Sequence, residues 1–179
     1  MGQVVDYMML MTYDQYWSTS PTPGSVAQVT WVEKNIKKVL GIVPKEKLLL
    51  GIPFYTRLWK EEKSSDGRIS AYSVKSLSME EAKKLVKENN ASVRWDEESG
   101  QFYCEYRSNG TTYKIWLEET NSINLKSSLV QKYGLAGVAA WKRSDAALEI
   151  WGVLQKNLKE IESYQVWLAE NKSKAYVYD

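Results

Sequence analysis

Three apolar stretches of the chain each end in residues whose side chains can do chemistry. They end in Met11-Thr12-Tyr13-Asp14, in Tyr55-Thr56-Arg57 and in Trp141. If the three stretches are neighbouring parallel strands, an acid, an arginine, two phenols and an indole converge on one rim. This set suits a carbohydrate, because an indole stacks on a sugar ring while polar groups fix its hydroxyls and amides. A surface ion pair for Arg57 and a core position for Trp141 are the structural alternatives.

The residues that the chain lacks narrow the chemistry further. There is no histidine, and Cys104 is the one cysteine. This excludes a Ser-His-Asp triad, a Cys-His pair, a histidine-ligated metal and an internal disulfide within the chain. No glycine-rich phosphate-binding loop is found, which argues against a nucleotide or redox enzyme. Any chemistry must come from carboxylates, phenols, arginine or lysine, and we expect no cofactor and no metal.

Composition and charge are those of a globular domain. The chain has 179 residues, of which 44% are hydrophobic and 26% charged, and its net charge is +2. This length suits one domain, with room for a small inserted one. Without a long run of one charge or an apolar segment of spanning length, we expect neither nucleic acid nor membrane as a partner. The aromatic residues are eight Trp and twelve Tyr against two Phe, a bias that suits stacking on sugars as well as core packing.

The segments that precede these polar residues in the sequence predict two parallel strands joined by a helix. The run Val4–Met11 is apolar at successive positions except for Asp6, a pattern typical of a strand covered on both faces. A loop with Tyr16 and Trp17 follows. Ser25 and Gln28 predict a capping box at the start of a helix that ends near Gly41, and Leu48–Ile52 predicts a second buried strand. Strand, helix and strand in this order predict a right-handed parallel unit.

The stretch from Leu58 to Glu119 does not continue this alternation of strand and helix, and its mixed pattern predicts a small α+β insertion. Ser78 and Glu81 form a capping box at the start of a helix. Asn109-Gly110 favours a tight hairpin. The predicted strands of this insertion are Ile69–Val74, Ser92–Asp96, Gln101–Arg107 and Thr111–Leu117.

After this insertion the alternation of helix and parallel strand continues. A helix is predicted over Asn121–Tyr133 with Gly134 as its stop, followed by a third buried strand over Leu135–Trp141. A last helix is expected from Ser144 through Leu158. The tail beyond it has a weak helical pattern to about Leu168, and the pattern assigns no structure to residues 175–179.

Taken together, these segments resemble family 18 of the glycoside hydrolases, the chitinase-type barrels. The matching pieces are Met11-Thr12-Tyr13-Asp14, Gly51 to Arg57, Trp116 to Lys126 and Gly137 to Trp141. The resemblance implies an α/β fold that is the C-terminal portion of a TIM (β/α)8 barrel with an inserted small α+β domain. The implied divisions are residues 1–57 with barrel strands six and seven, 58–119 as the insertion, 120–160 with the eighth strand, and 161–179 as a tail. The bacterial spore-associated and cortex-lytic branch looks most similar.

The resemblance also implies site roles. In this family hydrolysis is substrate-assisted, with the 2-acetamido group of the sugar as nucleophile. Tyr13 would hydrogen-bond the acetamido oxygen, and Asp14 would bind hydroxyls or orient its neighbours. Trp141 would form the floor under the sugar being cleaved. The remaining substrate-binding residues implied are Tyr55, Arg57 and Met11.

One departure from the family pattern divides the function into two hypotheses. The family's acid lies in an Asp-x-x-Asp-x-Asp-x-Glu motif, and no such spacing occurs in this chain. The chain is then either the substrate-binding part of a glycosidase acting on N-acetylglucosamine polymers, chitin or peptidoglycan, or a non-catalytic sugar-binding domain like the chitinase-like lectins. We expect it to be inactive alone, and to self-associate through strand edges that the N-terminal barrel half would cover. By resemblance, the parent protein is extracellular, cell-wall or spore-associated.

Overall fold

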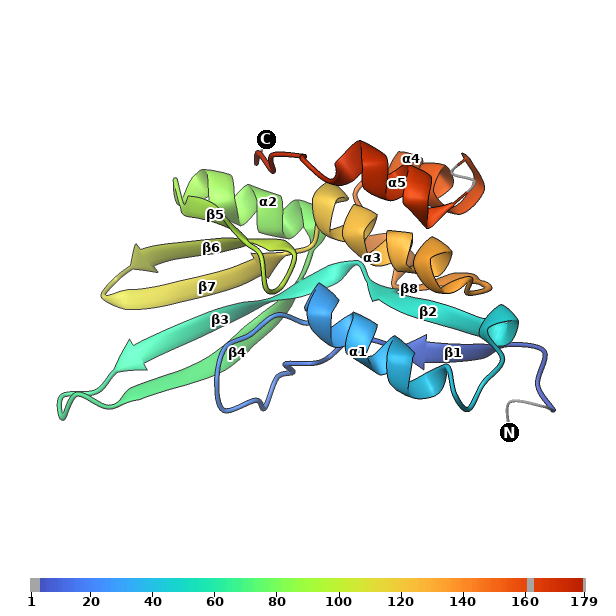
Figure 1. The fold of residues 1–179 in the computed structure, drawn as a ribbon. Coiled ribbons are helices and arrows are strands. Elements are labelled where there is room, and N and C mark those ends of the chain that lie inside the picture. The colour runs from blue at the N-terminus through green and yellow to red at the C-terminus, as the bar shows by residue number, and fades with distance from the viewer. Residues whose placement is uncertain (1–3, 161–162, 179) are drawn as a thin grey trace.

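A computed structural model describes residues 4–160 and 163–178 of the chain. Figure 1 shows two sheets joined end to end, with most helices along one side of them. The first sheet is parallel and three-stranded, and the second is antiparallel and five-stranded. The described residues form no closed barrel.

The parallel sheet has the order β1-β2-β8 and contains β1 (Met8–Met11), β2 (Leu48–Pro53) and β8 (Gly137–Trp141). Both pairings are parallel, which confirms the prediction that the three apolar runs are neighbouring parallel strands. Helices α1 (Val29–Val39) and α3 (Thr120–Tyr133) supply residues to the same hydrophobic core as β2, among them Ile36, Leu50 and Ile123. A short 3-10 turn, Lys45–Lys47, precedes β2.

The expectation that the first strand is covered on both faces is wrong for the described chain. Strand β1 begins at Met8 instead of Val4, and its residues alternate between half-buried and exposed. Met9 and Met11 expose 45% and 62% of their surface, whereas Met8 and Leu10 pack against the core. Only one face of β1 therefore packs against the core within the described chain. The third strand was also predicted to be buried, over Leu135–Trp141, but β8 begins at Gly137 and its residues are half-buried or exposed.

The antiparallel sheet has the order β4-β3-β7-β6-β5. Its strands are β3 (Tyr55–Lys63), β4 (Ile69–Ser78), β5 (Ser92–Asp96), β6 (Gln101–Ser108) and β7 (Thr111–Leu117). Helix α2 (Met79–Glu88) packs on it through Ala82 and Val86. We call this sheet with α2 the lobe. Strand β3 was not predicted, and it starts one residue after Phe54, so Tyr55, Thr56 and Arg57 belong to the lobe sheet. The division of the chain at residues 57 and 58 stays a prediction.

Helix α2 begins with a side-chain cap, and helix α1 does not. The capping box of Ser78 and Glu81 is confirmed, with Glu81 N–H donating to Ser78 Oγ at 3.2 Å and Ser78 N–H to Glu81 Oε2 at 2.8 Å. The capping box predicted at Ser25 is wrong. The helix begins at Val29, so the residue at its cap position is Gln28, whose side chain pairs with Gln15 instead of capping. Ser25 lies too far upstream to cap this helix; its Oγ accepts the backbone N–H of Ala27 at 3.0 Å and donates to Gln101.

Helix α3 ends as predicted, at Gly134, which adopts a left-handed φ of 65°. It starts at Thr120, one residue before the predicted start. Glu119 caps this start by accepting the backbone N–H groups of Asn121 and Ser122 at 2.9 Å each. A carboxylate at this position also suits the positive end of the helix dipole.

The last predicted helix is shorter than expected. Residues 143–145 form a 3-10 turn, α4 spans Ile150–Gln155, and a π-helical turn follows over Lys156–Glu160. Helix α5 (Tyr164–Asn171) lies in the tail, where a weak helical pattern was predicted. Beyond it, the Tyr176 ring stacks on Trp95 of the lobe at 3.8 Å. Positions 1–3, 161, 162 and 179 of the predicted divisions lie outside the described residues.

A buried ion pair lies at the joint between the lobe and the parallel sheet. Lys126 Nζ on α3 donates to both carboxylate oxygens of Glu118, at 2.6 and 2.8 Å, and both side chains are 1% exposed. Ser122 Oγ and Gln101 Nε2 donate to the same carboxylate at 2.7 and 2.9 Å. Three donor groups therefore make four hydrogen bonds to the Glu118 carboxylate, which satisfies its buried charge. This network fixes the end of β7 to the start of α3.

Candidate functional site

The register of the three parallel strands places the predicted site residues at the same end of the sheet, the carboxyl ends of the strands. Met11 pairs with Gly51, and Gly51 pairs with Ala139. Two residues further along the three strands are Tyr13, Pro53 and Trp141, and the last two are a direct pair. We call this set of carboxyl ends the rim. In parallel α/β folds this is the end at which binding groups gather.

The approach of Tyr13 to the sheet depends on a glycine. A Cβ built on Gly51 would lie 2.6 Å from the Leu10 carbonyl oxygen and 3.1 Å from the Tyr13 ring. Thr12 Oγ1 donates to the Gly51 carbonyl at 2.6 Å, which ties the chain after β1 to β2. Gly51 therefore lets β1 and the Tyr13 ring come close to β2. Burial, and then the charge of Asp14, raise the pKa of the Tyr13 phenol, so it stays a hydrogen-bond donor.

Asp14 is the centre of a polar cluster that joins the rim to the lobe. The Tyr55 hydroxyl donates to Asp14 Oδ1 at 2.6 Å, and Arg57 Nη2 donates to the same oxygen at 3.0 Å. Asp14 has a positive φ of 56°, an uncommon conformation that aspartate tolerates better than most residues. Burial, and then the bond to Asp14, raise the pKa of Tyr55, so its proton remains on the phenol. The cluster leaves Asp14 Oδ2 without a partner among the described residues.

Trp141 and Met11 present apolar surface at the same rim. Trp141 is 56% exposed, and its carbonyl accepts the backbone N–H of Phe54 at 2.8 Å, which holds the end of β8 against the start of the lobe. An exposed indole with a fixed backbone is suited to stacking on the apolar face of a sugar. The site therefore combines a stacking surface, a phenolic donor and an oriented carboxylate.

The set of donors does not resemble a metal centre. Among residues 4–160 and 163–178, no three Asp, Glu or Cys side chains are grouped so that they could hold an ion. Within the same residues, no helix is long and apolar enough to cross a membrane. The chemistry at the rim is that of hydrogen bonding and stacking.

Comparison with known proteins decides the family. The model of the glycosyl hydrolases family 18 matches residues 1–146, which is most of the chain. The chain belongs to this family. Among curated relatives, a glycosylase of Bacillus subtilis named YvbX, itself uncharacterized, is 26% identical over 161 residues. The cortical fragment-lytic enzyme of Bacillus anthracis is 26% identical over 157 residues.

Solved structures agree with the family assignment. The chitinase from Chromobacterium violaceum is 27% identical with a TM-score of 0.77, and the match covers 88% of this chain and 47% of that one. Family and neighbours support a TIM-barrel-type glycosidase fold, of which the described residues form a small α/β part. The chain matches 88% and 87% of its own length to the two curated relatives, but only 44% and 35% of theirs.

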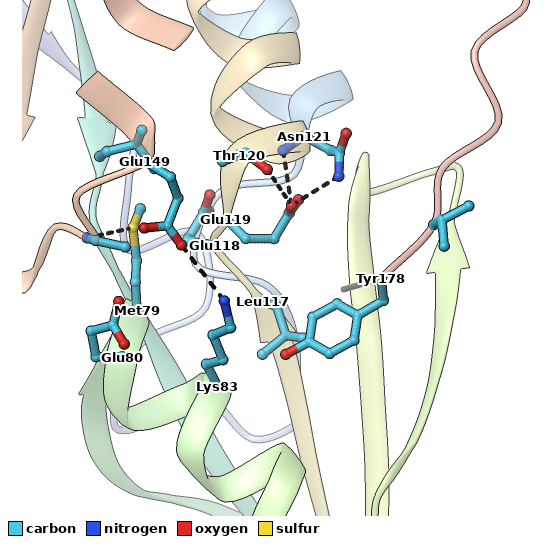
Figure 2. A pocket seen from close by; sticks show the side chains of 13 residues that line it. Met79, Glu80, Lys83, Leu117, Glu118, Glu119, Thr120, Asn121, Glu149 and Tyr178 are labelled. Atoms are coloured by element: carbon cyan, nitrogen blue, oxygen red, sulfur yellow. Dashed lines mark hydrogen bonds and ion pairs between the residues drawn. The ribbon is translucent and has the colours of Figure 1, made fainter. Parts of the chain in front are cut away.

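The pocket in Figure 2 lies away from the rim. It has a volume of about 250 Å³ and is enclosed by α2, the start of α3, the residues before α4 and the tail, with Lys83 pointing toward Glu149. None of the predicted site residues lines it. Four of its charged lining residues already have partners, since Glu118 binds Lys126, Glu119 caps α3, and Lys83 pairs with Glu149. We therefore keep the rim as the candidate site.

The structure brings together part of the predicted set and adds one residue to it. Asp14, Tyr55 and Arg57 are in contact, while Tyr13, Met11 and Trp141 lie along the same strand ends. Ser76 of β4 was not predicted, and its hydroxyl accepts a long hydrogen bond from Arg57 Nη1 at 3.5 Å. Only the pairing of β3 with β4 reveals it, and no local sequence signal does. The binding roles of these residues stay predictions.

Proposed function

We propose that this chain is the substrate-binding C-terminal portion of a family 18 glycoside hydrolase that acts on N-acetylglucosamine-containing polysaccharide, chitin or peptidoglycan. The observation that carries this proposal is the Asp14 cluster, set beside exposed Trp141 at the carboxyl ends of parallel strands. In this proposal, β1, β2 and β8 correspond to the sixth, seventh and eighth barrel strands, and the lobe is the inserted domain. The parent protein would act outside the cell, at a cell wall or on a spore.

Each rim residue has a role in a retaining, substrate-assisted hydrolysis. The Tyr13 phenol donates to the acetamido oxygen of the bound sugar, which holds that oxygen toward the anomeric carbon. Asp14 offers Oδ2 to the substrate, while Tyr55 and Arg57 hold Oδ1 and so fix the carboxylate. Trp141 supports the sugar ring, and Met11 adds apolar surface below it. The proton for the leaving oxygen must come from a carboxylic acid outside this set.

We propose as the alternative a non-catalytic carbohydrate-binding function, because the rim binds and orients a sugar without itself holding a proton donor; the chain spans less than half of the length of the curated relatives it matches. A rim that binds and orients a sugar without a proton donor is a carbohydrate-binding site, as in the chitinase-like lectins. The two functions differ in one residue, because a glutamate supplied by another segment of the same protein would make the site catalytic. Both require that the rim bind N-acetylglucosamine units.

Binding of the N-acetylglucosamine hexamer by the chain tests the proposal. Calorimetric or NMR titration should show binding that the glucose hexamer, which lacks acetamido groups, does not reproduce. Trp141→Ala should abolish most of the affinity, whereas Trp151→Phe should not change it, because Trp151 lies on α4 against buried Phe54. Equal binding of the two hexamers, or unchanged binding by the Trp141 variant, would contradict the assignment.

A further inference from the structure

A polar pocket lies where α3, the π-helical turn and α5 meet, among the helices of the C-terminal part of the chain (Figure 1). Its volume is about 170 Å³, whereas one water needs only about 10–15 Å³, so the pocket has room for a small solute. Side-chain amides and ammonium groups dominate its lining, and none of the predicted rim residues belongs to it. The residues that supply these groups are Asn121, Asn124, Asn157, Asn171, Lys156 and Lys174.

Asn157 carries an unused hydrogen-bonding atom in this pocket. The residue is 1% exposed, and its Nδ2 donates to the Asn124 carbonyl at 3.1 Å, to Asn124 Oδ1 at 2.8 Å and to Ser127 Oγ at 2.8 Å. All three acceptors lie on α3, so the amide nitrogen is turned toward that helix and the oxygen away from it. Within residues 4–160 and 163–178, Asn157 Oδ1 has no hydrogen-bond partner. A buried acceptor without a partner is costly, and a bound donor would remove that cost.

The network on α3 fixes which atom of the Asn157 amide is left over. Ser127 Oγ has one proton, which it donates to the Ile123 carbonyl at 2.6 Å, so it can only accept from Asn157. Asn124 Oδ1 also accepts the Trp167 indole N–H, at 3.0 Å. A reversed amide would place its oxygen against three acceptors. The leftover atom is therefore the oxygen, which requires an N–H or O–H donor.

The walls of the pocket are already in place. Asn157 lies in the π-helical turn, and single π-helical turns are frequent at functional sites. The Asn157 carbonyl accepts Gln131 Nε2 at 3.2 Å, which ties the turn to α3. Asn124 Nδ2 donates to Asn171 Oδ1 at 3.1 Å, which ties α5 to the same helix. A site held by such bonds needs little ordering when a ligand enters.

The two lysines of the pocket differ in their pairing. Lys156 Nζ pairs with Glu170 at 2.9 Å. Lys174 is exposed, has no carboxylate partner in the described part of the chain, and lies with its Nζ 5.9 Å from the centre of the Tyr176 ring. Asn121 Nδ2 donates to Glu119 at 2.9 Å, so the Asn121 oxygen is the end of that amide available to a donor. The pocket thus offers amide acceptors together with a cation on its solvent side.

We propose that this pocket binds a small zwitterion of the amino-acid class. The ammonium group of the ligand donates to Asn157 Oδ1, and its carboxylate lies at Lys174. A carboxylate alone leaves the buried acceptor without a donor, and an amine alone leaves the lysine without an anion, so a ligand that carries both groups fits best. This second site is independent of sugar binding at the rim.

Titration of the chain with alanine, followed by NMR, tests the inference. The reporter is the Trp167 indole N–H, which is bonded to Asn124 Oδ1 and is identified by its loss in Trp167→Phe. Alanine should shift this resonance, and the N-acetylglucosamine hexamer should not. Acetate and methylammonium should each bind about tenfold more weakly than alanine, because each satisfies one end of the site. Either ion binding as tightly as alanine overturns the choice of a zwitterion.

A matched pair of surface variants tests the site without disturbing the helices. Lys174→Ala should weaken alanine binding by about twofold to fivefold, and Lys172→Ala, an exposed residue of the same tail outside the pocket, should leave it unchanged. Asn157→Leu removes the leftover acceptor and should abolish binding, with urea denaturation showing that the variant is folded. An unshifted Trp167 resonance at saturating alanine, or equal effects of the two lysine variants, overturns the inference and leaves the proposed function standing.

Discussion

Replacement of Lys126 by methionine should destabilise the chain in a way that depends on pH. The substitution keeps the length of the side chain but leaves the Glu118 carboxylate buried without its cation. Breaking a buried pair by removing one partner typically costs about 3–5 kcal/mol. Ser122 and Gln101 still donate to the carboxylate, at 2.7 and 2.9 Å, so we expect the lower end, about 3 kcal/mol at pH 7. For a chain of this size, that loss lowers the melting temperature by about 6–12 °C.

The pH dependence follows from the direction of the Glu118 pKa. Burial raises this pKa, while Lys126 pulls it down, so the variant should have a folded pKa further above that of the unfolded chain. A group whose folded pKa is raised contributes its stability below the unfolded pKa, and loses it as the pH rises through the folded pKa. The deficit of the variant should therefore be largest at pH 7 and shrink toward pH 5, by up to about 1.4 kcal/mol per pH unit.

Urea denaturation followed by tryptophan fluorescence at both pH values measures the two effects. The matched control is Lys84→Met, which removes an exposed ion pair with Glu88 and should cost less than about 0.5 kcal/mol at either pH. The double variant Glu118→Gln with Lys126→Met should be more stable at pH 7 than Lys126→Met alone, because it removes the unpaired charge. A Lys126→Met deficit that matches the control, or that does not change with pH, would refute this account of the joint.

Three further predictions concern the rim and the open sheet. The chain should not turn over a fluorogenic N-acetylglucosamine oligomer at a detectable rate, since general acid help is worth about a hundred- to ten-thousand-fold; turnover by the purified chain that is lost in Asp14→Asn would show this to be wrong. Gly51→Ala should lower the free energy of unfolding, measured by urea denaturation, by about 1–3 kcal/mol and weaken saccharide binding, because its Cβ meets the Leu10 carbonyl. The control Gly41→Ala has open space around its Cβ and should not lower the free energy of unfolding. Because β1 and β8 each have one unpaired edge within the described chain, light scattering should show a mass that rises with concentration; a constant monomer mass would contradict this.

The sequence predicts an element correctly where the element is determined by residues that are close together in the chain. The strands β2 and β8 and the capping box of Ser78 and Glu81 were predicted, because strand formation and capping depend on residues within a short stretch. The burial expected of β8 was wrong, since its residues are half-buried or exposed. The positive φ at Gly134, where α3 ends, follows from the same kind of local signal. These strands bring Trp141 to the same end of the sheet as Tyr13. The prediction of the rim therefore required one long-range assumption, which is that the three strands are parallel neighbours.

The errors arise where a distant partner overrides a local signal. Ser25 reads as a helix cap, yet its hydroxyl is bound by Gln101, which lies 76 residues away. Strand β3 was missed because Tyr55–Arg57 read as the end of the preceding strand, and only pairing with β4 and β7 makes them part of the lobe. The exposed face of β1 was missed because a run of apolar residues predicts burial without saying what covers it.

The most direct test of the central claim is to locate the acetamido methyl group of a bound N-acetylglucosamine oligomer on the chain. NMR contacts between that methyl group and aromatic protons can be measured for weak complexes. The account predicts contacts to the rings of Tyr13 and Trp141, and their loss in Trp141→Ala. Contacts confined to the pocket of Figure 2, or to the lobe away from Asp14, would contradict it.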